Sequence, residues 1–169
     1  MIMNRLCILV FLLLVCACGE TPKASENTFE ECLYEQPEAI FSSSVPTVVN
    51  HEFIMNGRVG VERIVFESGL QIDIHQSGCD ELQQNFFFYL DKSLSATATI
   101  TQAAEYFYDL GTLDEAYLPL YEWGDLINKH AAAISLEQSY VVYPGFYVTI
   151  KQYKKKSNHL LEVVLSQAG

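Results

Sequence analysis

Along the chain after residue 47, apolar and polar residues first alternate, as they do in half-buried strands. The pattern predicts four strands, at residues 48–55, 59–66, 70–75 and 85–90. Asn56-Gly57 favours a tight turn between the first two strands, because both residues tolerate a positive φ. A break in the alternation between Val61 and Ile64 suggests a bulge in the second strand.

Between residues 99 and 134 the apolar residues recur every three or four positions, which is the period of helices. One helix is expected to start at a Thr99 or Thr101 cap and to end at Gly111, and another to start at Pro119. The alternation then returns and predicts three further strands, at residues 138–143, 146–153 and 159–166.

A short N-terminal helix is predicted over residues 28–36, where a capping box precedes apolar residues and Pro37 stops the helix. Strands and helices are thus segregated along the chain. This order predicts one α+β domain over residues 28–169. The domain would hold an antiparallel sheet of about six or seven strands, with the two central helices packed on one face.

The start of the chain has a different pattern. Arg5 precedes an apolar run over residues 6–17, which is shorter than the roughly 20 residues that span a bilayer. A basic residue, a short apolar run and small residues at its end are typical of a secretory signal peptide. Val15-Cys16-Ala17-Cys18 ends the run and resembles the lipobox of bacterial lipoproteins.

This resemblance implies that residues 1–17 are a signal peptide, that Cys18 is acylated, and that residues 18–27 form a flexible tether. By resemblance to the sorting rules of enterobacterial lipoproteins, Gly19 after the cysteine implies the outer membrane, facing the periplasm. Two alternatives remain: cleavage by an ordinary signal peptidase, which would release a secreted protein, and an uncleaved membrane anchor.

Charge excludes one class of partner. Residues 18–169 contain all 21 acidic residues and nine of the ten basic ones, a net charge of −12. A nucleic-acid-binding protein would show a basic surface instead. The acidity also argues against a domain that lies flat on anionic lipid, so the acyl chains would be the contact with the bilayer. Basic residues concentrate near the C-terminal end, where Lys154, Lys155 and Lys156 form a predicted hairpin tip.

Two cysteines remain after the leader and Cys18 are set aside. In an oxidising compartment an even pair predicts a disulfide, here between Cys32 and Cys79. A metal site or two free thiols are the alternatives, and a CxxC motif is absent.

Candidate chemistry is sparse. His51, Asp73 and His75 would be weak metal-ligand candidates if the strands brought them together. The sequence contains no HExxH motif, no GxSxG elbow and no Gly-rich phosphate loop. We therefore expect no catalytic residue and no cofactor.

A possible interaction surface combines tyrosines around the helix connection with the lysine tip, since tyrosine is enriched at interfaces. Its members would be Tyr106, Tyr108, Tyr117, Tyr121, Lys154, Lys155 and Lys156. The sequence thus favours a membrane-anchored, non-enzymatic binding or accessory module that acts on another envelope protein. An inhibitor or immunity-type protein that blocks a hydrolase is the alternative, and an enzyme is a third.

Overall fold

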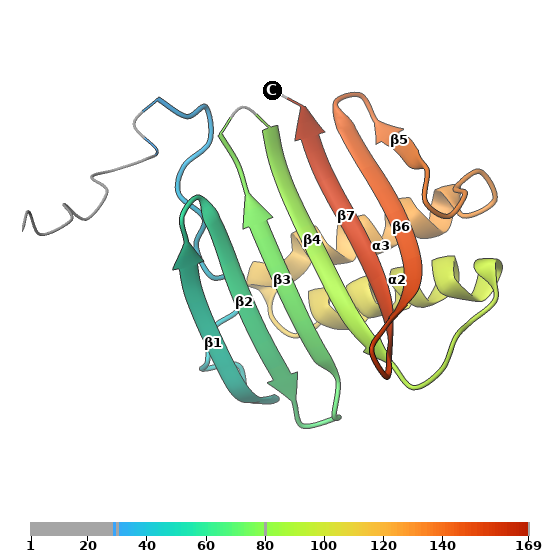
Figure 1. The fold of residues 1–169 in the computed structure, drawn as a ribbon, viewed down its shortest axis with the longest axis horizontal. Helices are drawn as coiled ribbons and strands as arrows, with labels where there is room; N and C mark the ends of the chain where they lie inside the picture. The colour runs from blue at the N-terminus through green and yellow to red at the C-terminus, as the bar shows by residue number, and fades with distance from the viewer. Residues whose placement is uncertain (1–28, 30, 80, 169) are drawn as a thin grey trace, which may run out of the picture.

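The computed structural model of the protein describes residues 29, 31–79 and 81–168. The described elements follow the predicted order of four strands, two helices and three strands (Figure 1). Their bounds are β1 (Val48–Asn56), β2 (Val59–Phe66), β3 (Gln71–Ser77), β4 (Glu81–Leu90), α2 (Ala96–Gly111), the 3-10 turn η1 (Glu115–Tyr117), α3 (Leu118–His130), β5 (Ser139–Tyr143), β6 (Phe146–Lys155) and β7 (Asn158–Ala168). Cys18, the predicted signal peptide over 1–17 and the predicted tether over 18–27 lie outside the described residues.

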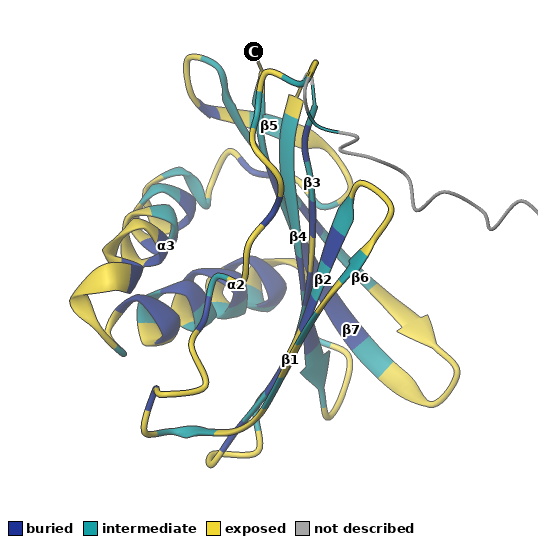
Figure 2. Cartoon of the chain, turned by 90° about the vertical axis from the view of Figure 1, so that its left-hand side faces the viewer, coloured by how far each residue is buried: buried dark blue, intermediate teal, exposed yellow. Residues whose placement is uncertain are grey.

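The strands of the described residues form one sheet in the order β1-β2-β3-β4-β7-β6-β5, and all neighbours pair antiparallel. Figure 2 shows α2 and α3 together on one side of this sheet, with no helix of the described chain on the other side. The predicted α+β fold, with two helices packed on one face of an antiparallel sheet, is confirmed. β4 lies between β3 and β7, near the middle of the sheet.

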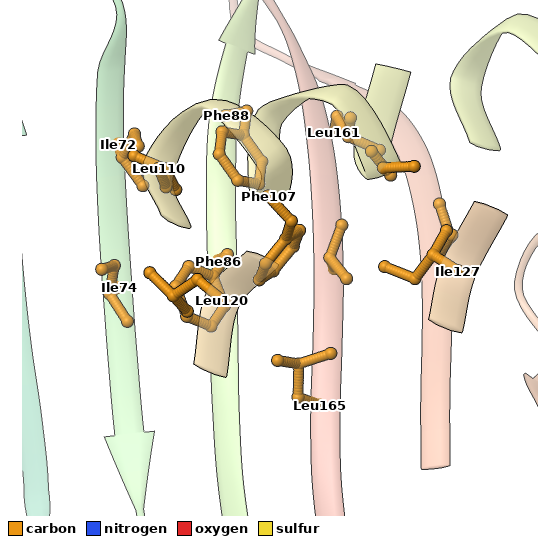
Figure 3. Packing of buried hydrophobic residues seen from close by; sticks show 14 of the residues in the cluster. Ile72, Ile74, Phe86, Phe88, Phe107, Leu110, Leu120, Ile127, Leu161 and Leu165 are labelled. Atoms are coloured by element: carbon orange, nitrogen blue, oxygen red, sulfur yellow. The ribbon is translucent and has the colours of Figure 1, made fainter. Parts of the chain in front are cut away.

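The core lies between the sheet and the helices. Phe86 and Phe88 project from β4 toward Phe107 of α2, and their ring centroids lie 4.9 and 6.0 Å from that of Phe107. Leu120 and Ile127 of α3 complete the same layer (Figure 3). Side chains of this size dominate the hydrophobic stabilisation of a core.

Residues 31–47, called the N-terminal segment below, cover the part of the sheet that the helices leave free. The segment runs beside β1 and β2 on the helix side (Figure 2). Its Phe41 is buried, and the ring centroid of Phe41 lies 4.8 Å from that of Tyr117 and 6.1 Å from that of Phe66. The core therefore depends on a stretch that has no regular secondary structure of its own.

The N-terminal segment does not contain the predicted helix. Residues 31–36 form a turn and bends, while residues 28 and 30 of that prediction lie outside the described residues. The N–H groups of Leu33 and Tyr34 donate to the carbonyl of Cys79, at 2.7 and 3.3 Å. A helix would require carbonyl acceptors within the segment. Tertiary hydrogen bonds therefore override the local capping signal.

The bulge predicted between Val61 and Ile64 is wrong. β2 pairs without interruption with β1 from Asn50 onward and with β3 from Val59 to Val65. Between Gly60 and Ile64 the inward-pointing residue is Glu62, which is fully buried. A carboxylic acid at an inward position made a regular strand look interrupted.

The first turn of α2 also differs from the prediction. The helix starts at Ala96, and its N-cap is Ser95, whose side chain accepts from the N–H of Ala98. Thr99 lies buried inside the first turn, and its hydroxyl donates to the carbonyl of Ser95. Neither this helix nor another within the described residues has the length and apolar character needed to cross a membrane.

Gly111 permits close packing of the two helices, because a Cβ atom there would overlap the backbone of Tyr121. Gly111→Ala is expected to lower the free energy of unfolding by about 1–3 kcal/mol through overpacking, although alanine is the better helix former. Urea unfolding followed by the fluorescence of Trp123 measures the change. Glu105→Ala, at an exposed site of α2, controls for helix propensity. A Gly111→Ala variant as stable as wild type would show that the helices separate there at no cost.

Candidate interaction surface

The side of the sheet without helices is called the open face below. A row of directly opposed residues crosses five strands on this face, and from β2 to β6 it reads Arg63, Asp73, Phe87, Glu162 and Lys151. Directly opposed residues on one face have Cβ atoms about 4.5–5.5 Å apart. The row therefore places charges of both signs and an aromatic ring side by side at the centre of the sheet.

Glu162 is the centre of this row and is only 7% exposed. Lys151 Nζ lies 3.5 Å from one of its carboxyl oxygens, and Asn85 Nδ2 donates to the other at 3.2 Å. Nearer the β1 edge, Arg63 and Glu52 form an exposed ion pair at 3.2 Å. The open face thus carries a shielded polar centre and a solvated polar edge.

Aromatic side chains flank the polar centre. Tyr89 stands opposite Leu160, and Leu160 stands opposite Tyr153. Leu160 is only 4% exposed, although it does not belong to the core beneath the helices. The hydroxyl of Tyr89 donates to Asp73 Oδ2 at 3.0 Å. Burial and this bond raise the pKa of Tyr89, while burial and the nearby Glu162 raise the pKa of Tyr153. Both phenols therefore remain neutral donors near pH 7.

His75 lies on the same face, with its ring centroid 4.9 Å from that of Phe87. Burial lowers the pKa of the imidazole below its ordinary value of 6.5, and the positive charges of Arg63 and Lys155 act in the same direction. Asp73 and Glu162 oppose the shift but do not cancel it.

The lowered pKa of His75 predicts how the free energy of unfolding depends on pH. The folded protein binds this proton less readily than the unfolded chain. The stability that neutral His75 contributes is therefore complete above pH 6.5 and is lost as the pH falls through the folded-state pKa. Between about pH 7.5 and about pH 5, His75→Gln should lose less unfolding free energy than wild type. Urea titrations at a series of pH values measure the difference, and a steeper loss in His75→Gln would contradict the assignment.

The structure does not bring the three candidate metal ligands together. His51 pairs with Ile64 and points to the helix side, whereas His75 pairs with Val61 and Asp73 with Arg63 on the open face. Among the described residues, no group of three or more His, Cys, Asp or Glu side chains is arranged to hold a metal ion.

The four tyrosines of the predicted interaction surface do not form one patch. Tyr117 is buried, and its hydroxyl accepts from the N–H of Ser42. Tyr106 stacks on Phe88 with 4.6 Å between ring centroids, and burial raises its pKa. Tyr108 and Tyr121 form a separate pair near the connection of α2 and α3, with centroids 4.9 Å apart. The prediction fails because helical spacing distributes these side chains over several directions.

The lysine tip lies at the far end of the sheet from the disulfide. Lys154, Lys155 and Lys156 are exposed at the β6–β7 turn, which Figure 1 shows at the bottom, while the N-terminal segment enters at the top. Figure 2 shows this hairpin bending away from the helices, toward the open side. The lysines thus form a basic rim of the open face and lie apart from the helix tyrosines.

The predicted disulfide between Cys32 and Cys79 is present. It joins the N-terminal segment to the connection between β3 and β4. The hydrogen bonds from Leu33 and Tyr34 to the carbonyl of Cys79 reinforce the same junction. The bridge therefore fixes the point at which the chain enters the domain.

Sequence reasoning missed a buried polar cluster under the N-terminal segment. Glu62 accepts from the N–H groups of Ile40 and Phe41, at 2.8 and 2.9 Å. His51 Nε2 lies 2.8 Å from the same carboxyl group, and Gln76 Nε2 donates to a carbonyl of the segment at 2.7 Å. This cluster holds the segment against β2 and β3. If the alternation of inward and outward residues in β2 is continued without a break, Glu62 falls at an inward position. That placement is the signal that would have revealed the cluster.

Comparison with protein-family models, curated proteins and solved structures finds no match for this chain. Its function is therefore inferred from the predicted signal peptide and from the surface of the domain.

Proposed function

We propose that the protein is a lipid-anchored, non-enzymatic binding module of a bacterial cell envelope and that its open face contacts another envelope protein. The observation that carries the proposal is the composition of that face. Phe87, Tyr89 and Tyr153 lie beside the paired charges of Glu162 and Lys151, and no helix of the described residues covers them. Aromatic residues with a few placed charges are typical of protein interfaces.

The leader supports the location. Acylation of Cys18 would attach the chain to a bilayer, outside the cytosol and most simply at the periplasmic side of the outer membrane. Residues 19–27 would give a flexible spacer of roughly 15–18 Å. The disulfide fits an oxidising compartment. A protein partner fits the open face better than nucleic acid does, since residues 18–169 carry a net charge of −12.

The proposal is tested by photocrosslinking in the native envelope. A photoreactive residue in place of Tyr153, which is 37% exposed on the open face, should give a defined adduct with another envelope protein. The matched control is Glu122, an exposed position on the outer side of α3. Equal adducts from both positions, or none from Tyr153, would contradict the proposed binding face.

The anchor gives a separate prediction. Cys18→Ser removes the thiol that would be acylated and should move the protein from the membrane fraction to the soluble fraction, or stall its processing. Each acyl CH₂ in the bilayer contributes about 0.8 kcal/mol, so loss of the chains abolishes stable attachment. Cys16→Ser is the control, because its thiol leaves with the leader, and it should fractionate as wild type does. Unchanged membrane attachment of Cys18→Ser would rule out the lipid.

A further inference from the structure

β5 is the outermost strand on one side of the sheet, so no strand of the described residues pairs with its outer edge. Such an edge presents a row of free N–H and C=O groups. Residues 138–150, which include β5, contain no Asp, Glu, Lys, Arg or His. On β5 itself, Val141 is 51% and Tyr143 is 63% exposed.

The opposite edge of the same sheet provides a comparison. β1 carries Glu52 near its centre, in an ion pair with Arg63, and its ladder is irregular between Val48 and Asn50. Charges and bulges both discourage the pairing of an edge with another chain. β5 has an irregularity beside its turn but no charge. The β1 edge is therefore protected in a way that the β5 edge is not.

We propose that β5 pairs with an extended, uncharged strand of the partner polypeptide, which adds one strand to the sheet. This inference rests on the proposed function, because it states where the envelope partner docks. Main-chain hydrogen bonds supply affinity in this mode of recognition, and alternate side chains supply specificity. A charged residue beside Val141 or Tyr143 would be desolvated without a counter-charge, so the edge selects an uncharged strand.

A cleft of about 500 Å³ lies between the first turns of α2 and residues 131–136, which precede β5, and could receive a side chain from the end of an added strand. Its apolar lining comes from the first turns of α2 and from the residues that lead into β5, namely Ala96, Ile100, Ala131, Ile134 and Leu136. Alternate residues of a strand paired with β5 point to the helix side of the sheet. The cleft therefore favours an aliphatic or aromatic residue at those positions.

A second copy of this chain fits the edge less well. Antiparallel pairing of β5 with β5 would rotate the second copy by half a turn in the plane of the sheet. Cys79 lies at the same end of the sheet as Gly145, since Ala168 pairs with Glu81 and donates to the carbonyl of Gly145. The two N-terminal segments would then lie beyond opposite ends of the paired β5 strands, which are roughly 17 Å long for five residues. The two chains would therefore enter their domains from opposite directions, which disfavours attachment of both to one bilayer.

Photoreactive residues placed singly at Ser139 and Val141 of the full, membrane-anchored chain test the inference. Both positions should crosslink to the same partner protein. The two crosslinked residues of the partner should be about two positions apart in an uncharged stretch, because residues of paired strands face each other one by one. Adducts with a second copy of this chain would overturn the proposal. Adducts with a charged segment would also overturn it, as would adducts from Ser139 and Val141 with partner residues that are far apart in the sequence.

Two variants test whether the crosslink from Ser139 depends on strand pairing at β5. Val141→Lys should lower the adduct yield from Ser139 by roughly tenfold or more, because a lysine on an edge strand discourages pairing with another chain. Val141→Thr keeps a β-branched residue and should stay within about twofold of wild type. Thermal unfolding of the purified variants checks that both fold, and Tyr143→Lys replaces Val141→Lys if the latter does not. Equal yields from the lysine and threonine variants would contradict strand pairing.

The Tyr153 position separates this inference from the proposed function. An adduct from Tyr153 with an envelope protein, without any adduct from Ser139 and Val141, would overturn the β5 pairing and leave the open face as the binding site. The absence of adducts from all three positions would overturn both proposals.

Discussion

Glu62→Ala is expected to lower the free energy of unfolding by about 3–5 kcal/mol. The carboxyl group of Glu62 is fully buried and accepts two backbone N–H groups of the N-terminal segment. Alanine would leave those donors and His51 without this acceptor, and the N–H of Phe41 would be buried without a partner. It would also leave a cavity where the side chain stood.

Urea unfolding followed by Trp123 fluorescence, with the disulfide intact, measures this effect. Glu62→Gln should be intermediate, because an amide keeps one accepting oxygen but turns an N–H₂ group toward other donors. Glu52→Ala is the matched control on the neighbouring strand, and loss of its exposed ion pair should cost less than about 1 kcal/mol. A Glu62→Ala variant no less stable than Glu52→Ala would show that the buried cluster does not hold the segment.

The double replacement Cys32→Ser, Cys79→Ser is expected to cost about 4 kcal/mol, the loop-closure entropy that the chain-entropy model assigns to a bridge of this sequence separation. The bridge ties the N-terminal segment to the β3–β4 connection before the segment reaches the core. Its loss frees the unfolded chain and also loosens the covering of β1 and β2.

Unfolding of the serine pair beside oxidised wild type measures the contribution of the bridge, and reduced wild type should match the serine pair. A serine pair as stable as oxidised wild type would show that the hydrogen bonds to Cys79 fix the segment without the bridge. Combined with Glu62→Ala, the loss should differ from the sum of the two separate losses, since both changes act on the same segment.

Much of the fold follows from local pattern. The strands and helices were predictable because the residues that face the core repeat with a period of two or near 3.6. The pairing of Cys32 with Cys79 was predictable because no other cysteine remains once the predicted signal peptide and Cys18 are set aside. β2 shows where this reasoning fails. Glu62 occupies an inward position because its hydrogen-bond partners come from a distant segment of the chain. The local pattern of apolar and polar residues contains no information about such partners.

The open face likewise combines features that local pattern could predict with neighbours that only the order of strands in the sheet brings together. The faces of His51, Asp73 and His75 depend on strand register, and a one-residue difference reverses the side. Their relative sides depend on two turns, the one at Gly57-Arg58 between β1 and β2 and the one between β2 and β3, so both registers were needed. In contrast, no local signal joins Tyr89, Tyr153 and Glu162. They become neighbours because β7, the last strand in the sequence, lies between β4 and β6 in the sheet.

The open face and the β5 edge have their proposed roles only if the chain is held at a membrane. The most direct measurement is the intact mass of the protein extracted from the native membrane, together with the identity of its first residue. We predict a chain that begins at Cys18 and carries the mass of two or three acyl chains. A chain that retains residues 1–17, or one that begins at Cys18 without acyl mass, would contradict it.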